Sequence, residues 1–248
     1  MLPEFTLFQW TLAILAALGV GVSKSGLPGI GLFHVVVMAH LFPGLASTGI
    51  VLPLLIAGDI GAVLLFRRDA RWDYVFRTLP PALLGVAAGW WLMGHLRGAR
   101  FGPWIGGIVL GLAGLQFIRY RRPDLWQHVP HSRLFAWAIG LVAGVTTMLA
   151  NAAGPVMAIY LLAVSLPKDQ FVGTAAWFFL LINLLKVPFS AALGLITPST
   201  LAFNAVLIPV VALGLWLGKR FLMHLPQRWF DQLVLVFAVV AAIKLLLS

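Results

Sequence analysis

Long apolar runs, separated by short polar or glycine- and proline-containing breaks, dominate the 248-residue chain. Several runs have close to the ~20 residues that an α-helix needs to cross the roughly 30 Å hydrocarbon core of a bilayer. The apolar segments span about 5–22, 30–42, 47–66, 78–95, 103–120, 134–149, 156–166, 171–196, 201–221 and 229–247. The pattern predicts an all-α polytopic membrane protein with about eight full-length or broken transmembrane helices, in up to ten helical pieces.

Two of the breaks occupy the same place in each half of the chain. The first apolar run ends in Ser23-Lys24-Ser25-Gly26-Leu27-Pro28-Gly29, and the run that opens the second half ends in Ala150-Asn151-Ala152-Ala153-Gly154-Pro155. A short apolar piece follows each break. Paired interruptions of this kind, at corresponding positions of two halves, are the best indication of a transport site that a membrane sequence offers.

The halves are also related residue by residue. Residues 80–101 match residues 209–230 at seven of 22 positions. The matched residues are Pro80 and Pro209, Leu84 and Leu213, Gly85 and Gly214, Gly89 and Gly218, His95 and His224, Leu96 and Leu225, and Phe101 and Phe230. The sequence therefore predicts two homologous transmembrane repeats, residues 1–120 and 134–248, joined by a cytoplasmic linker at 121–133.

The distribution of basic residues indicates how the repeats are oriented. The loop at 67–73 carries three arginines, and the basic linker follows two helices later, so both are expected in the cytoplasm. The equivalent loop of the second half, 197–200, carries no charge, whereas Lys219 and Arg220 occupy the next loop. Equivalent loops then face opposite sides, which predicts inverted repeats. Inversion requires each broken element to enter and leave on one side, and two arginines near residue 100 argue against it.

Composition excludes several classes of protein and ligand. The chain is 61% hydrophobic and only 10% charged, which excludes a soluble globular domain. Its net charge of +10 follows from basic loops, so no nucleic-acid partner is expected. It has no cysteine, and its six histidines lack metal-ligand spacing, so no metal or other cofactor is predicted. With seven acidic residues and no nucleophile motif, the chain is not expected to be an enzyme.

The residues of the two breaks are suited to an oxyanion. A half-helix that begins at a break directs its free N–H groups into protein or water, because they cannot remain unpaired in lipid. Lys24 adds a positive charge, and hydroxyl and amide side chains add neutral hydrogen bonds. The predicted substrate-binding residues at the breaks are Ser23, Lys24, Ser25, Gly26, Gly29, Thr146, Thr147, Asn151 and Gly154. The alternative is that the breaks are packing kinks, with Lys24 extended toward lipid headgroups.

Three polar residues lie inside long apolar runs. Asp59 and Lys186 each cost roughly 2.5–3.5 kcal/mol at the centre of a bilayer, so neither is expected to face lipid. Aligning the repeats places them close together. They form a structural ion pair, or else Lys186 holds the anion while Asp59 carries a coupling proton. Asn183, one turn before Lys186, is expected to line the same cavity.

These motifs resemble the TauE/SafE sulfite exporter family, also grouped as toluene sulfonate uptake permeases. The residues that carry the resemblance are 21–29, 42–43, 47–49, 52–56, Asp59, 144–155, 166–168, 171–174, Trp177, Asn183, Lys186 and Pro188. The resemblance implies export of sulfite or an organosulfonate such as sulfoacetate across a bacterial cytoplasmic membrane, by proton-linked or facilitated transport. It identifies neither the substrate, the coupling ion nor the oligomeric state.

The sequence therefore favours an inner-membrane secondary transporter whose partners are a small anion, membrane lipid and protons. Alternating access would expose a site between the breaks to each side in turn. An anion channel, an intramembrane enzyme and a non-transporting partner subunit are the competing hypotheses.

Overall fold

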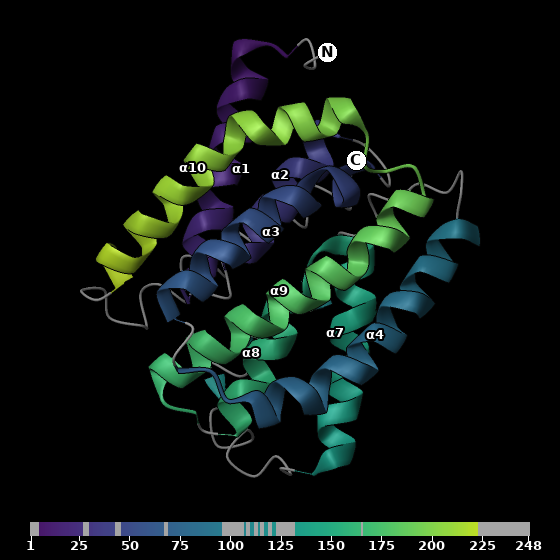
Figure 1. Cartoon of the computed structure of the whole chain (residues 1–248), viewed down its shortest axis with the longest axis vertical. Coiled ribbons are helices and arrows are strands. Elements are labelled where there is room, and N and C mark those ends of the chain that lie inside the picture. Colours follow the sequence, from purple (N-terminus) through teal and green to yellow (C-terminus); the bar gives the residue numbers. More distant parts are fainter. Residues whose placement is uncertain are drawn as a thin grey trace.

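The computed structural model describes residues 5–26, 30–42, 46–66, 69–95, 132–164 and 166–222, together with 107, 110, 111, 114, 117, 118, 121 and 122. Within these ranges the fold consists of helices, without strands (Figure 1). The helices are α1 (Leu7–Lys24), α2 (Gly31–Leu41), α3 (Ala46–Phe66), α4 (Trp72–His95), α7 (Arg133–Ala150), α8 (Ala153–Ala163), α9 (Lys168–Ala192) and α10 (Pro198–Leu222).

The helices agree with the apolar runs of the sequence, with one clear difference. Five of them, α1, α3, α7, α9 and α10, are long and apolar enough to cross a membrane. The fourth helix begins at Trp72, six residues before the expected start, because Asp73 and Arg77 are exposed on its first two turns and are tolerated there. The helix predicted at 229–247, and most of that at 103–120, lie outside the described residues.

Both helix breaks have a local conformational cause. After α1, Gly26 has φ 111°, and after α7 the capping residue Asn151 has φ 51°. A right-handed helix cannot continue through a left-handed residue, and glycine and asparagine are the residues that adopt this region at least cost. The chain then starts a new short helix, α2 or α8. Each half therefore opens with a long helix, a break and an 11-residue helix.

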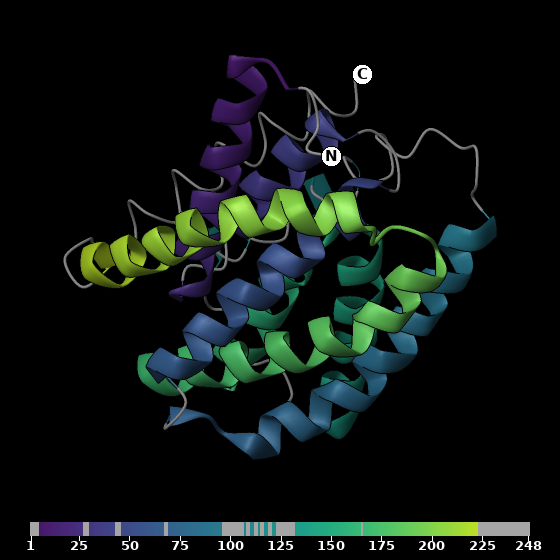
Figure 2. The same cartoon turned by 45° about the horizontal axis from the view of Figure 1, so that its top comes forward.

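The two halves start at opposite ends of the molecule. In Figure 1, α1 runs down from the end that carries the N-terminus, whereas α7 runs up from the other end. The helices α3 and α9 lie side by side in the middle and run in opposite directions (Figures 1 and 2). The helices also pack closely in the outer pairs α1 with α10 and α4 with α7.

The two outer helix pairs cross at glycines. A Cβ atom added at Gly21 in α1 would lie 2.1 Å from the carbonyl oxygen of Val211 in α10, and one at Gly144 in α7 would lie 1.9 Å from that of Ala82 in α4. No side chain larger than hydrogen fits at either crossing. The facing helices supply glycines as well, since Gly214 contacts Leu18 in the same way. Small residues that allow such close approach are a common basis of helix association in membranes.

Buried apolar side chains gather in two main clusters that divide the molecule into two lobes. One cluster joins α1, α2, α3 and α10, and the other joins α7, α8, α9 and α4, with part of α2. Large apolar side chains on the outside, among them Leu64, Phe76, Leu134 and Trp216, are exposed, as expected of a lipid-facing surface.

Candidate functional site

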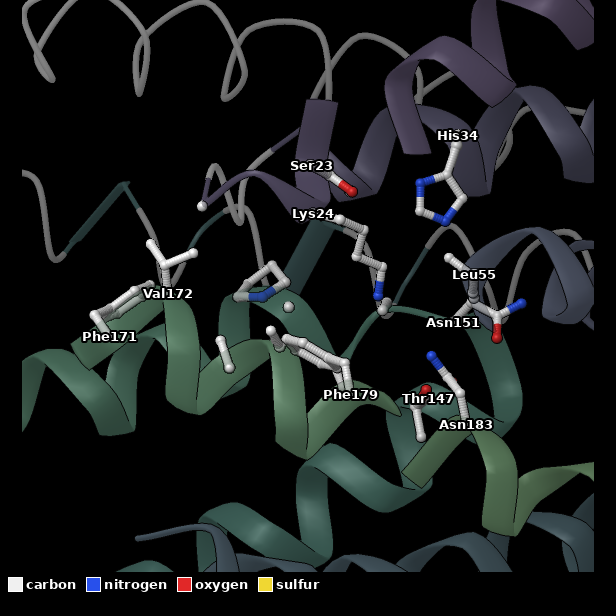
Figure 3. Close-up of a pocket in the computed structure, with 18 residues that line it drawn as sticks. Ser23, Lys24, His34, Leu55, Thr147, Asn151, Phe171, Val172, Phe179 and Asn183 are labelled. Atoms are coloured by element: carbon white, nitrogen blue, oxygen red, sulfur yellow. The ribbon is translucent and has the colours of Figure 1, made fainter. Parts of the chain in front are cut away.

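The two helix breaks meet at one cavity in the middle of the molecule. Residues from the end of α1, the start of α2, the α7–α8 break and α9 line this space, which has a volume of about 60 Å³ (Figure 3). A single water molecule needs roughly 10–15 Å³ by the same measure. The cavity therefore has room for a small group of atoms, such as a compact oxyanion.

Most of the residues predicted for the site line this cavity. They are Ser23, Lys24, Gly26, Thr147, Asn151, Gly154 and Asn183. In Figure 3, Lys24 extends down from α1 toward Phe179 and Asn183 of α9, while Thr147 and Asn151 approach from α7. Helices from both halves of the chain thus contribute to a single pocket.

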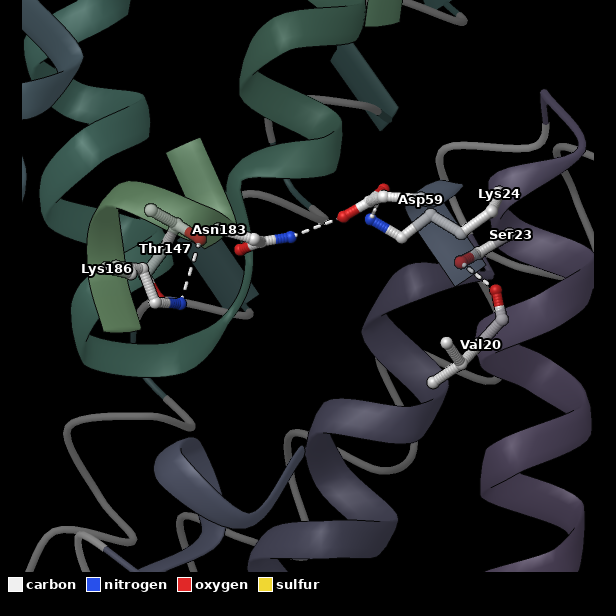
Figure 4. A network of polar contacts seen from close by, with 7 residues as sticks. All are labelled: Val20, Ser23, Lys24, Asp59, Thr147, Asn183 and Lys186. Atoms are coloured by element: carbon white, nitrogen blue, oxygen red, sulfur yellow. Dashed lines mark hydrogen bonds and ion pairs between the residues drawn. The ribbon is translucent and has the colours of Figure 1, made fainter. Parts of the chain in front are cut away.

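A buried ion pair lies beside the cavity. Lys24 Nζ is 2.6 Å from Asp59 Oδ1, and Asp59 is fully buried while the lysine side chain is 11% exposed. The Asn183 side-chain amide donates to the second carboxylate oxygen, Oδ2, at 2.7 Å (Figure 4). The Phe179 ring centroid lies 4.6 Å from Lys24 Nζ, a cation–π contact. Lys24 is therefore directed into the protein and not toward lipid headgroups.

A second buried lysine stabilises the end of α7. Lys186 Nζ donates to the carbonyl oxygen of Thr147 at 2.8 Å and to Asn151 Oδ1 at 2.5 Å. The last carbonyls of a helix lack intrahelical donors and form the negative end of its dipole, so a cation is well placed there. Asp59 thus forms its ion pair with Lys24, and the pairing with Lys186 considered from the sequence is wrong.

Three predicted residues, Ser25, Thr146 and Lys186, do not line the cavity. The Ser25 hydroxyl donates to the carbonyl of Val22, and the Thr146 hydroxyl donates to that of Val142, each at 2.8 Å. Both side chains are satisfied by their own helices and turn away from the cavity. Gly29 lies outside the described residues.

His34 on α2 is a cavity residue that the sequence did not reveal. Its side chain is 2% exposed, lines the cavity and has no hydrogen-bond partner for either ring nitrogen (Figure 3). The sequence did not indicate His34 as a site residue, because its spacing from His40 is not that of a metal-ligand pair. The available indication was its position as a buried polar side chain in a short, mostly apolar helix.

The charges around the cavity favour an anion. Lys24, Lys186 and Asp59 together carry one net positive charge when all three are ionised. Hydroxyl and amide groups from Ser23, Thr147 and Asn183 surround the space. Among the described residues, no group of three or more histidine or acidic side chains could hold a metal ion. A monoanion would balance the charge of this site.

Comparison with known proteins agrees with this chemistry. A family model described as "Sulfite exporter TauE/SafE" matches residues 13–245, a span that contains both breaks and every residue of the candidate site. No curated protein and no solved structure matches the chain.

Proposed function

The chain belongs to the TauE/SafE sulfite exporter family, and we propose that it moves a small sulfur-containing anion, such as sulfite or an organosulfonate, across the bacterial cytoplasmic membrane as a secondary transporter. The observation that supports this most is the shared cavity of the two breaks, which Lys24 and several neutral donors line, with the buried Lys186 behind Thr147 and Asn151. Neutral donors hold an anion without binding it so tightly that it cannot leave.

Lys24 is the group that responds to the substrate. Its ammonium forms an ion pair with Asp59, with Nζ 2.6 Å from Oδ1. An incoming oxyanion competes with this carboxylate for the same ammonium. Lys24 therefore contributes to anion binding only when its ion pair with Asp59 is broken.

Protonation of Asp59 offers a simple form of coupling. A neutral carboxyl no longer holds Lys24 by charge, so a proton on Asp59 favours an anion on Lys24. Because such linkage is reciprocal, the anion also favours the proton. Anion and proton then move in the same direction, and a monoanion with one proton crosses without net charge.

The packing of the helices supports an inverted-repeat transporter. Exchanging α1 with α7, α3 with α9 and α4 with α10 converts the pair α1–α10 into α7–α4 and leaves the pair α3–α9 unchanged. The glycines at the two crossings correspond in the same way: Gly21 of α1 corresponds to Gly144 of α7, and Gly214 of α10 corresponds to Gly85 of α4. We infer two repeats of opposite orientation, 1–120 and 134–248, with their pseudo-two-fold axis between α3 and α9.

Alternating access would follow from movement of the two lobes. The cavity lies where the cluster around α1 and α3 meets the cluster around α7 and α9. Each lobe contains one helix of the other repeat, because α10 packs with the first lobe and α4 with the second. A rocking motion at the α3–α9 contact would open the cavity to one side and close it to the other.

Flux into proteoliposomes that contain only this protein tests the proposal. We expect uptake of radiolabelled sulfite that saturates, is inhibited by unlabelled sulfoacetate or sulfate, and responds to a pH gradient. Flux that never saturates would favour an anion channel. Folded protein with no flux for sulfite or organosulfonates would contradict the proposed substrate class and favour a partner-dependent or enzymatic role.

A further inference from the structure

A second, smaller cavity adjoins the substrate cavity. It has a volume of about 10 Å³ and lies among α2, the start of α3 and the end of α7. Two residues, His34 and Asn151, line both cavities. These two side chains therefore form the partition between them.

The two cavities lie toward opposite ends of the molecule. Val172 of the larger cavity adjoins Gly173, which packs against the backbone of Phe66, Asp69 and Ala70, at the arginine-rich loop. Thr48 of the smaller cavity adjoins Gly49, which packs against Leu195 in the connection between α9 and α10. By the distribution of basic residues, the first end is cytoplasmic and the second is external.

The two partition residues are held very differently. The Asn151 side chain donates to the carbonyl oxygen of Thr48 at 2.9 Å and accepts from Lys186. It is fixed between α3, α7 and α9. The buried His34 ring makes no hydrogen bond at all. Because leaving a buried polar group without a hydrogen-bond partner costs free energy, a ligand that supplies a partner for this ring binds more favourably.

We propose that His34 is the external gate of the transport path and a transient ligand of the anion as it leaves the substrate cavity; the smaller cavity, too small for an anion in this structure, marks the external side of the closed gate. This inference rests on the proposed transport function. The ring can rotate without breaking a protein hydrogen bond, which suits a gate. Its N–H can donate to an oxyanion that has left Lys24, while Thr147 and Asn151 remain in place as fixed walls.

Cysteine accessibility tests the gate independently of flux, because the chain has no native cysteine. Ser47→Cys reports the smaller cavity and Ala175→Cys the larger one. The probe is 2-sulfonatoethyl methanethiosulfonate, an impermeant anionic reagent, applied to intact cells and to inverted membrane vesicles. We expect Ser47→Cys to react from the outside only, and Ala175→Cys to react from the cytoplasmic side.

Removing the gate should change this sidedness. In the double variant Ser47→Cys/His34→Ala, the cysteine should become reactive from the cytoplasmic side as well. Cytoplasmic labelling of Ser47→Cys with His34 intact would overturn the proposal. So would unchanged sidedness in a folded double variant. These results do not require the substrate to be sulfite, so they distinguish failure of the gate from failure of the proposed substrate.

The ligand role has its own measurement. His34→Leu keeps a bulky side chain but removes both ring nitrogens, and His34→Gln keeps a donor. We expect at least tenfold slower sulfite flux in His34→Leu and partial recovery in His34→Gln, with both proteins monodisperse in detergent. Equal flux in His34→Leu and wild type would show that the ring nitrogens do not serve the anion. Equal loss in both variants would indicate a packing role alone.

Discussion

Two lysines at membrane depth are stabilised by different acceptors. Lys24, at the end of α1, uses a carboxylate, whereas Lys186 uses the end of α7 and the Asn151 side chain. Each acceptor offsets a burial cost of roughly 2.5–3.5 kcal/mol. The carboxylate of Lys24 can be neutralised by a proton, but the carbonyl that holds Lys186 cannot. A proton on Asp59 can therefore release Lys24 for an anion, whereas no proton can release Lys186 in this way.

The Lys24–Asp59 pair predicts a stability relation between three variants. Lys24→Met leaves Asp59 buried without its partner, and removal of one member of a buried pair costs about 3–5 kcal/mol. The double variant Lys24→Met/Asp59→Asn leaves no buried charge, so it should unfold at a higher temperature than Lys24→Met alone. Thermal unfolding in detergent measures this. A double variant as unstable as the sum of the single changes would contradict the pairing.

Removal of Lys186 should weaken anion binding. Lys186→Ala eliminates the fixed positive charge behind Thr147 and Asn151, so we expect at least a tenfold increase in Kd for sulfite, about 1.4 kcal/mol. Lys219→Ala, at an exposed position near the end of α10, is the matched control and should change binding by no more than about 0.5 kcal/mol. Wild-type affinity in Lys186→Ala would remove this lysine from the site.

Asp59→Asn should abolish the pH dependence of anion binding. In the wild type, a falling pH protonates Asp59 and frees Lys24, so affinity should rise as pH falls. Asparagine cannot take up a proton, and affinity should stay at the low-pH level throughout. Methanesulfonate is the ligand of choice because its own charge does not change in this range. Asp169→Asn, exposed at the start of α9, should retain the wild-type profile. A profile unchanged in Asp59→Asn would leave Asp59 a structural role.

At the scale of helices, the breaks and the crossings have separate functions. Gly26 and Asn151 end the long helices and so create space for a substrate. The crossing glycines do the opposite, because they remove all space between α1 and α10 and between α4 and α7. Tight crossings keep each helix pair rigid, so that in the proposed alternating-access mechanism each lobe would move as a unit around the cavity.

Gly144→Ala should therefore be destabilising. The new methyl group would lie 1.9 Å from the Ala82 carbonyl oxygen, and overpacking of this kind costs about 1–3 kcal/mol or more. The control is Gly94→Ala near the end of α4, where an added Cβ meets no atom within 4 Å. That change should be neutral or stabilising by up to about 1 kcal/mol. Similar unfolding temperatures for the two variants would contradict the close crossing.

At the scale of the whole molecule, inversion predicts which loops face the cytoplasm. Single-cysteine variants Asp69→Cys and Lys219→Cys should react with an impermeant thiol reagent in inverted vesicles, and Ser199→Cys should react in intact cells. Positions 69 and 199 hold equivalent places in the two proposed repeats, so labelling from opposite sides supports inversion. Labelling of both from one side would rule it out.

Much of the site could be predicted from local patterns. Apolar run length predicts the helices, because a bilayer requires about 20 apolar residues per crossing. The breaks contain glycine, proline and asparagine, whose backbone preferences end a helix locally, without help from distant contacts. The duplicated breaks therefore indicated Lys24, Thr147, Asn151 and Gly154 as cavity residues before any tertiary contact was known. The TauE/SafE resemblance, confirmed by the family match, rests on the same local motifs.

The partners of the charged residues could not be predicted in this way. Asp59 lies 35 positions from Lys24 and 127 from Lys186, and nothing local indicates which lysine it contacts. The choice depends on how α1, α3, α7 and α9 pack, since two atoms must come within about 3 Å of each other to form a charge-assisted hydrogen bond. The same holds for His34, whose missing partners are visible only once its neighbours are placed. Sequence determines which residues can bind an anion here, and packing decides which of them are free to do so.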